Sequence, residues 1–140
     1  MNWKKIVVST VLNGIVLLLV LVAVQQLAIA INPNFNPSSL KGMRSPNDPI
    51  LVFYFAYPWV LALALSIAFS FFHRSFGHLP IFKQGVHFGL IVWMLICLPN
   101  AFLLYTSMDY GETFFLANTL SYFISFIIAG IVASFVFAKK

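Results

Sequence analysis

Hydrophobic residues in this chain form four long runs that short polar segments separate. Each run is long enough for a helix to cross a bilayer, which takes roughly 20 apolar residues. Several stretches, such as residues 15–22, are apolar at every position, which excludes the alternation of a membrane barrel strand. The pattern predicts an all-α fold, a four-helix bundle in one transmembrane domain over residues 1–140. The expected spans are Ile6–Ile31, Leu51–Phe72, Val86–Thr106 and Thr113–Phe137.

Composition supports an integral membrane protein. Of 140 residues, 61% are hydrophobic and 17% aromatic, with only 8 lysines and arginines and 3 acidic residues. A soluble domain of this length carries about 35 charged residues. One short chain could not bury so many large apolar side chains away from water. The formal charge of +5 is too small and too scattered for a nucleic-acid-binding surface, so we expect no nucleic-acid partner.

The first run has to be distinguished from a cleavable secretory signal. It follows the basic segment Met1–Lys5, and Ala28–Ala30 resembles a cleavage site. However, about 19 residues precede Gln25 in this run, against roughly 7–15 in a signal peptide. We expect a retained helix, with a cleaved signal as the alternative.

The positions of lysine and arginine predict an orientation. With four spans, the two termini and the connection near residues 73–85 lie on one side of the membrane. That side carries six basic residues, and the other side carries only Lys41 and Arg44. The positive-inside rule therefore places both termini in the cytoplasm. The six residues are Lys4, Lys5, Arg74, Lys83, Lys139 and Lys140.

The outer loop over residues 32–50 is predicted to be irregular. Asn32–Pro37 and Ser45–Pro49 together contain four prolines, which disfavour a regular helix and favour turns. The loop is long for a connection in a bundle. It is either a solvated connector or a segment that docks on the helices or on a partner.

Small residues recur every four positions in the fourth span and make a ridge along one face. Such a ridge lets another helix approach closely. Ala62, Ser66 and Ser70 repeat the spacing in the second span, and Gly85 and Gly89 form a similar pair in the third. Packing inside the bundle is the favoured interpretation, and homo-oligomerisation is the alternative. The ridge consists of Ala117, Ser121, Ser125, Ala129 and Ala133.

The sequence contains few residues that could take part in proton transfer, redox chemistry or metal binding. No Asp, Glu, Lys or Arg lies inside a span, and such residues usually mark proton relays and ion coupling. Cys97 is a single cysteine in an apolar run, where it acts as a small hydrophobe. His73, His78 and His87 have no Cys or acidic neighbour that would suggest a metal site. We expect no enzyme, no metal and no cofactor.

One group of polar residues lies at a common depth. At about 1.5 Å per residue, five side chains fall roughly 8–9 Å from the outer ends of the spans. Pro99 adds to this layer because it disturbs the helix near Leu95. The layer either forms hydrogen bonds between helices or lines a small pocket open to the outer leaflet. Its members are Gln25, Gln26, Tyr57, Asn100 and Asn118. Asn13, in the inner half, is expected to bond to Ser66 or Ser134.

The order of these features resembles that of small bacterial four-helix integral membrane proteins of unknown function. The features are Gly85-x-x-x-Gly89-Leu90, then Pro99, then Gly130. The resemblance covers the whole chain as architecture and implies a bacterial inner membrane. Other families differ. Small multidrug transporters have a glutamate in the first helix, where Asn13 and Gly14 stand here. Fluoride channels, vitamin-K-reductase-like enzymes, claudins and tetraspanins have motifs or cysteines that this sequence lacks.

These observations lead to one expected function and one alternative. We expect a non-enzymatic multi-pass membrane protein that acts as an accessory, assembly or immunity-type partner of another membrane component. The alternative is an oligomeric small-molecule channel or transporter with a polar pocket in the outer half. The expected partners are the lipid bilayer, a second membrane protein or further copies of the chain.

Overall fold

The computed structural model describes residues 2–32 and 47–138, and within these ranges the chain is helical without a strand. The first helix is α1 (Trp3–Ile31). The second begins as the 3-10 segment η2 (Pro49–Ala56) and continues as α2 (Tyr57–Phe72). The third consists of α3 (Ile81–Val92), the π-helical turn η3 (Trp93–Cys97) and α4 (Leu98–Ser107). The last helix is α5 (Glu112–Ala138).

All four helices are long and apolar enough to cross a membrane. The four spans expected from the sequence lie inside them. The third helix begins at Ile81 rather than Val86, because Pro80 is its N-cap and the polar residues that follow belong to its first turns. The irregular outer loop expected over residues 32–50 lies mostly outside the described residues, which resume at Asn47.

Prolines explain the two departures from regular α-helix. Pro49 starts η2, where Asp48 caps the segment by accepting a hydrogen bond from the Ile50 amide at 2.9 Å. Pro58 stands in the first turn of α2, and because it has no amide hydrogen it cannot extend an α-helix back through η2. In the third helix, the residue before Pro99 donates its amide to the Trp93 carbonyl. This i to i−5 bond is the π turn that absorbs the proline.

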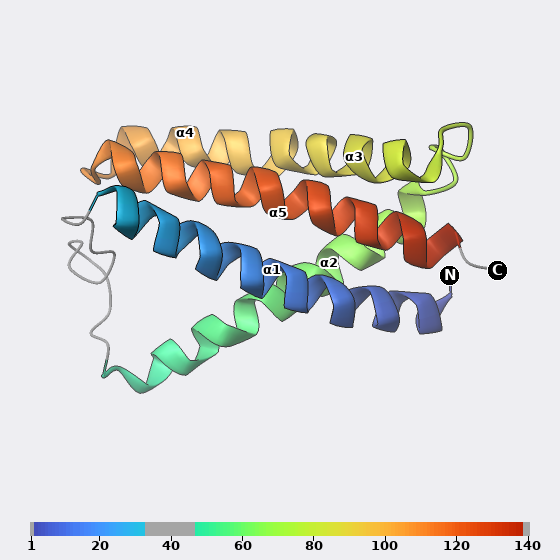
Figure 1. Ribbon diagram of the computed structural model, residues 1–140, viewed down its shortest axis with the longest axis horizontal. Coiled ribbons are helices and arrows are strands. Elements are labelled where there is room, and N and C mark those ends of the chain that lie inside the picture. The colour runs from blue at the N-terminus through green and yellow to red at the C-terminus, as the bar shows by residue number, and fades with distance from the viewer. Residues whose placement is uncertain (1, 33–46, 139–140) are drawn as a thin grey trace.

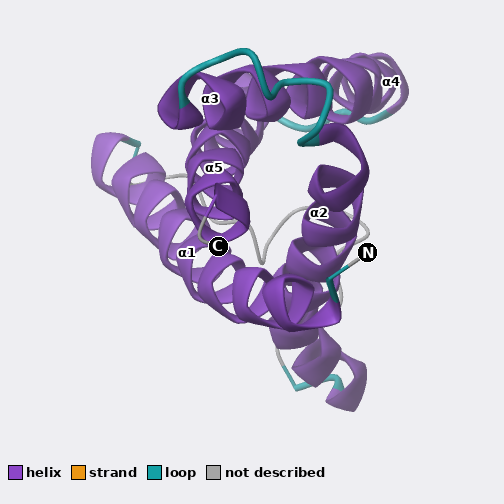
Figure 2. Cartoon of the chain, turned by 90° about the vertical axis from the view of Figure 1, so that its right-hand side faces the viewer, coloured by secondary structure: helices purple, strands orange, loops and turns teal. Residues whose placement is uncertain are grey.

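The helices are arranged as two pairs joined through a central contact (Figure 1). α1 packs against α2, and α5 packs against α3. α1 also packs along α5, which joins the pairs. Figure 2, viewed along the bundle, shows the end of α2 leading through the teal loop into α3. The helices that α2 contacts most are α1 and, to a lesser extent, α5.

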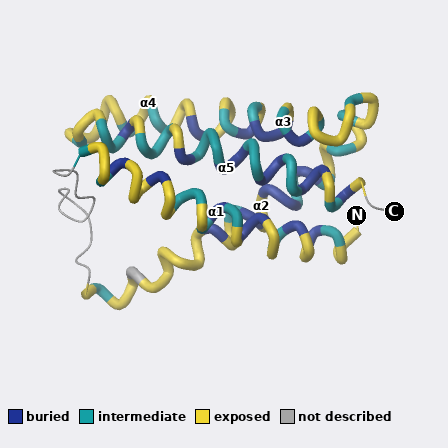
Figure 3. The backbone as a smooth tube through the Cα atoms, in the orientation of Figure 1, coloured by how far each residue is buried: buried dark blue, intermediate teal, exposed yellow. Residues whose placement is uncertain are grey.

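Burial follows this arrangement. The most fully buried large side chains include Phe69, Ile6 and Leu17, which lie between the helices. Phe69 packs edge-on against Phe88, with ring centroids 5.0 Å apart. The η2 segment diverges from the other helices, and those of its residues whose burial is described are exposed (Figure 3). Apolar side chains around the perimeter are also exposed, as expected for helices that face lipid.

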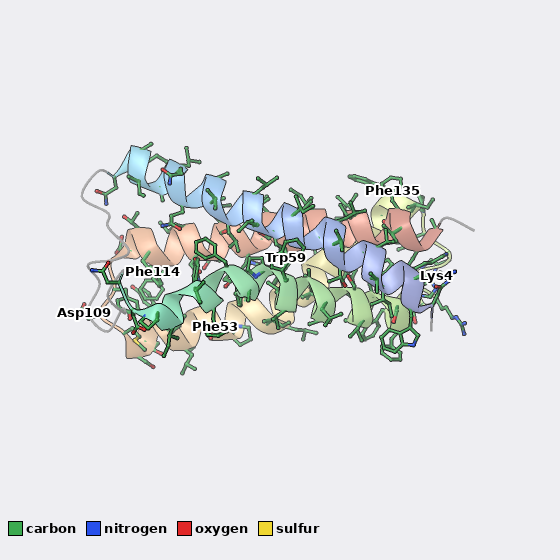
Figure 4. All side chains as sticks on the ribbon, turned by 90° about the horizontal axis from the view of Figure 1, so that it is seen from below. Lys4, Phe53, Trp59, Asp109, Phe114 and Phe135 are labelled. Atoms are coloured by element: carbon green, nitrogen blue, oxygen red, sulfur yellow. The ribbon has the colours of Figure 1, made fainter. Side chains whose placement is uncertain are left out.

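Charged residues divide between the two ends of the bundle. Lys4, Lys5, Arg74 and Lys83 lie at the end where α1 begins and α5 ends, which we call the basic end. Asp48, Asp109 and Glu112 lie at the opposite end, which we call the acidic end. Lys4 and Asp109 mark these two ends in Figure 4.

Candidate functional site

The predicted polar layer is not assembled inside the bundle. Gln25 and Gln26 on α1 are exposed, and so is Asn100 on α4. Asn118 on α5 is partly buried. Among the described residues, none of these four amides has a hydrogen-bond partner. The structure therefore places three amides on the perimeter of the bundle, within segments that are apolar enough to span a membrane.

Tyr57, the fifth member of the predicted layer, has a partner that the sequence interpretation did not include. Its hydroxyl lies 2.7 Å from the hydroxyl of Tyr122 on α5. The Tyr122 ring packs against Phe126, with ring centroids 5.6 Å apart. This hydroxyl pair connects α2 to α5. Tyr122 lies one helical turn after Asn118, so its position inside an apolar run was the signal that could have identified it.

A second polar cluster is buried between α1 and α2. Ser9 is the common acceptor: Ser66 donates its hydroxyl to the Ser9 oxygen at 2.9 Å, and Asn13 donates its side-chain amide at 3.2 Å. The three residues are fully buried. The expected partner of Asn13 was Ser66 or Ser134, but Ser9 lies one turn before Asn13 on the same helix and takes this bond. Ser134 instead donates to the Ile131 carbonyl at 2.8 Å.

The Asn13 carbonyl oxygen is left without a hydrogen-bond partner in this cluster. The hydroxyl oxygens of Thr10, Ser121 and Ser125 are also buried without a hydrogen-bond partner. A buried acceptor without a partner costs about 1–3 kcal/mol. The interior therefore holds several small polar groups but little hydrogen bonding between α5 and its neighbours at these positions.

The predicted small-residue ridge of α5 is directed into the bundle. Ser121, Ser125, Ala129 and Ala133 are all buried, and Ala117 is partly buried. The closest approach involves glycine rather than alanine or serine. A Cβ on Gly85 would overlap the backbone of Gly130 and Ile131, and one on Gly89 would overlap the backbone near Phe126. α3 and α5 are thus in backbone-to-backbone contact, as small residues permit in membrane bundles.

A glycine also shapes the contact between α1 and α2. Gly14 is buried, and a Cβ there would overlap the six-membered part of the Trp59 ring. Trp59 lies where α1 and α2 face each other (Figure 4). Because Gly14 has no side chain, the indole can lie directly on the α1 backbone.

Histidines at the basic end bond to the backbone. The Nδ1 atom of His73 lies 2.9 Å from the Ser70 carbonyl, and that of His87 lies 2.8 Å from the Lys83 carbonyl. His73 also stacks on Phe69, with ring centroids 6.3 Å apart. Within the described ranges, no three His, Cys, Asp or Glu side chains come together as metal ligands would.

Comparisons with protein families, with curated proteins and with solved structures gave no match for this chain. Its function therefore has to be argued from the arrangement described above. That arrangement comprises exposed amides on α1 and α4, a hydroxyl pair between α2 and α5, and a buried serine–asparagine cluster between α1 and α2.

Proposed function

We propose that this chain is a non-enzymatic multi-pass membrane protein that acts as an accessory, assembly or immunity-type partner of another membrane component. The observation that carries the proposal is the exposure of Asn100, Gln25 and Gln26 within membrane-spanning helices. At about 1.5 Å per residue, Asn100 lies roughly 10 Å inward from the end of α4. This position belongs to the hydrocarbon region and lies below the head groups.

The energetic cost of such amides favours a protein neighbour. Moving an unpaired amide from water into hydrocarbon costs roughly 2–7 kcal/mol on transfer scales. A helix of another protein that presents a polar group recovers part of this cost, since hydrogen bonds between helices in lipid contribute about 0.6–2 kcal/mol each. Because the bundle leaves these amides on its perimeter, an external partner accounts for them better than an internal pocket does.

The proposed location is the inner membrane of a bacterium, with both termini in the cytoplasm. The orientation is supported by the basic residues at one end of the bundle, which the positive-inside rule assigns to the cytoplasm. The bacterial source rests on the resemblance in architecture alone. In this orientation, the exposed amides lie in the half of the bilayer that faces away from the cytoplasm.

Photocrosslinking in the membrane tests the proposed contact. A photoreactive amino acid replaces Leu103, an exposed residue one turn from Asn100, in cells that make the full chain. We expect crosslinking to one discrete membrane protein. The substitution Asn100→Leu should reduce this product about 3-fold to 30-fold, the loss that corresponds to one hydrogen bond in lipid.

One control substitution and two alternative crosslinking results decide whether the proposed contact exists. The substitution Phe102→Leu changes an exposed apolar neighbour and should leave the product unchanged. Crosslinks to lipid only, with no dependence on Asn100, would contradict the proposal. Crosslinks to a second copy of this chain would favour the oligomeric channel or transporter over a separate partner.

A further inference from the structure

The π turn of the third helix leaves one backbone carbonyl without a helical donor. A carbonyl accepts from the amide four residues later in an α-helix and from the amide five residues later in a π-helix. For Met94, the first of these donors is the Leu98 amide, which bonds to the Trp93 carbonyl instead. The second is Pro99, which has no amide hydrogen. Neither helical donor is therefore available to the Met94 carbonyl.

The next carbonyl along the chain is affected as well. Pro99 stands at the position that supplies the α-helical donor for Leu95, so this donor is missing too. Side chains do not replace the lost donors. The Trp93 indole bonds to the Thr119 carbonyl at 3.4 Å, and no side chain of the described residues donates to Met94 or Leu95. The turn therefore holds more acceptors than donors.

The π turn also lies on the perimeter of the bundle, near the middle of its span. The side chains of Met94, Leu95 and Ile96 are exposed, and the α4 segment that follows has no buried residue. The span runs over Ile81–Ser107. At about 1.5 Å per residue, Met94 lies roughly 20 Å from both ends, close to the bilayer midplane. Lipid head groups and bulk water are remote at this depth, which favours a neighbouring helix as the donor.

We propose that the partner helix donates a hydrogen bond to the Met94 carbonyl in the π turn. This contact rests on the proposed function, because it belongs to the same partner. A carbonyl only accepts, so the partner has to present a hydroxyl, an amide or an indole N–H here. Asn100 both donates and accepts, and it is therefore less selective. The two contacts are continuous, since Asn100 directly follows Pro99 and both residues are exposed.

Solid-state NMR can observe this carbonyl alone, because the dipeptide Met-Leu occurs once in the sequence, at residues 94 and 95. Methionine labelled with ¹³C at the carbonyl and leucine labelled with ¹⁵N give one signal from a directly bonded ¹³C–¹⁵N pair. The carbonyl shift reports hydrogen bonding. We expect the non-bonded position for the full chain alone in lipid, and a downfield shift when the chain is isolated with its crosslinked partner.

The substitution Pro99→Ala tests the same contact in cells. It restores an amide that donates within the helix to the carbonyls of the π turn, so the partner meets no free acceptor. With the photoreactive amino acid in place of Leu103, we expect the crosslinked product to fall about 3-fold to 30-fold, the effect of one hydrogen bond between helices in lipid. Alanine is a good helix former, so this variant should fold normally, which circular dichroism checks.

Leu98→Ala is the matched control, because it trims an exposed side chain next to Pro99 without adding a donor. It should leave the product unchanged. An equal loss in Leu98→Ala and Pro99→Ala would overturn the inference, since the contact would then depend on side-chain packing.

The NMR signal separates failure of this inference from failure of the proposed function. A signal that stays in place when the partner binds would overturn the inference, although crosslinking to a discrete protein would still support the function. A bonded position in the chain alone would overturn it too, because water or a second copy would then be the donor. Crosslinks to lipid only would contradict the proposed function itself and, with it, the partner contact.

Discussion

At the scale of single residues, two hydroxyl pairs and two of the amides in the spans have different surroundings. Tyr57 and Tyr122 meet across the interface between α2 and α5, and Ser66 meets Ser9 between α2 and α1. The amides of Gln25 and Asn100 lie on the perimeter instead. These two hydroxyl pairs therefore connect helices of the bundle, and the amides of Gln25 and Asn100 are available for contacts outside it.

The tyrosine pair gives a stability prediction. Removing one hydroxyl by Tyr57→Phe or Tyr122→Phe breaks the same 2.7 Å contact, so the two effects should not add. A double-mutant cycle, measured by unfolding in mixed micelles, should give a coupling free energy of about 0.6–1.7 kcal/mol.

Tyr105→Phe is the matched control, because the Tyr105 hydroxyl has no hydrogen-bond partner among the described residues although its ring packs on Phe115. It should change stability little. Additive effects of Tyr57→Phe and Tyr122→Phe would indicate that the two hydroxyls do not interact.

The candidate site was only partly predictable from the sequence, and the reason is geometric. Counting residues from the end of a helix gives the depth of a side chain in the membrane. It does not give the direction in which the side chain points around the helix axis. In a helix that is apolar on every side, packing against neighbours sets this direction. Depth placed Tyr57 and Asn100 in one layer, whereas packing brought the Tyr57 hydroxyl to Tyr122 and left the Asn100 amide without a partner among the described residues.

At the scale of elements, the bundle combines one very close helix pair with one open segment. α3 and α5 touch through Gly85, Gly89 and Gly130, with no side chain between their backbones. In contrast, η2 leaves the bundle and exposes aromatic residues such as Phe53. The close pair is expected to contribute most to the rigidity of the fold.

Substitution of a glycine in the close pair tests this expectation. Alanine favours a helix by about 1 kcal/mol over glycine. Gly89→Ala should nevertheless lower the free energy of unfolding, by about 1–3 kcal/mol net, because its methyl group overlaps the α5 backbone. Gly130→Ala should act in the same way. The measurement is chemical unfolding in micelles followed by circular dichroism.

Gly111→Ala serves as the control, since a Cβ at Gly111 meets nothing within 4 Å. It should be close to neutral. If Gly89→Ala and Gly111→Ala had equal effects, the close contact between α3 and α5 would not limit stability.

The elements themselves were largely predictable, because long apolar runs without charges leave little choice except helices in lipid. The irregular turns were harder to predict. Pro99 indicated a disturbance near Leu95, and the structure resolves it as a π turn from Trp93 to Cys97. Nothing in the apolar pattern distinguished the 3-10 segment η2 from an α-helix, since this difference depends on which backbone amides find a carbonyl.

At the scale of the whole molecule, the dominant feature is the separation of charge between the basic and acidic ends. This separation predicts how the bundle inserts, with the basic end on the cytoplasmic side. The prediction can be tested with single cysteines in a Cys97→Ala background. In intact cells, a maleimide that cannot cross membranes should label Gly111→Cys.

The same reagent should label Ser75→Cys only after the cells are opened, since residue 75 lies in the connection at the basic end. Both positions are exposed in the structure, so a difference in labelling reports the side of the membrane. The reverse pattern would invert the proposed orientation.

The π turn of the third helix determines the direction in which the residues after it face. A π turn contains one residue more than the α-helical turn it replaces, so it corresponds to a single-residue insertion. Deleting one residue within 93–97 would restore an ordinary turn and leave everything after it facing nearly the same way, whereas the same five residues in an α-helix would rotate everything after them by about 100°. Asn100 would then face a different neighbour at nearly the same depth. The direction of this amide is thus set by the number of residues in the preceding turn and can change without any substitution at position 100.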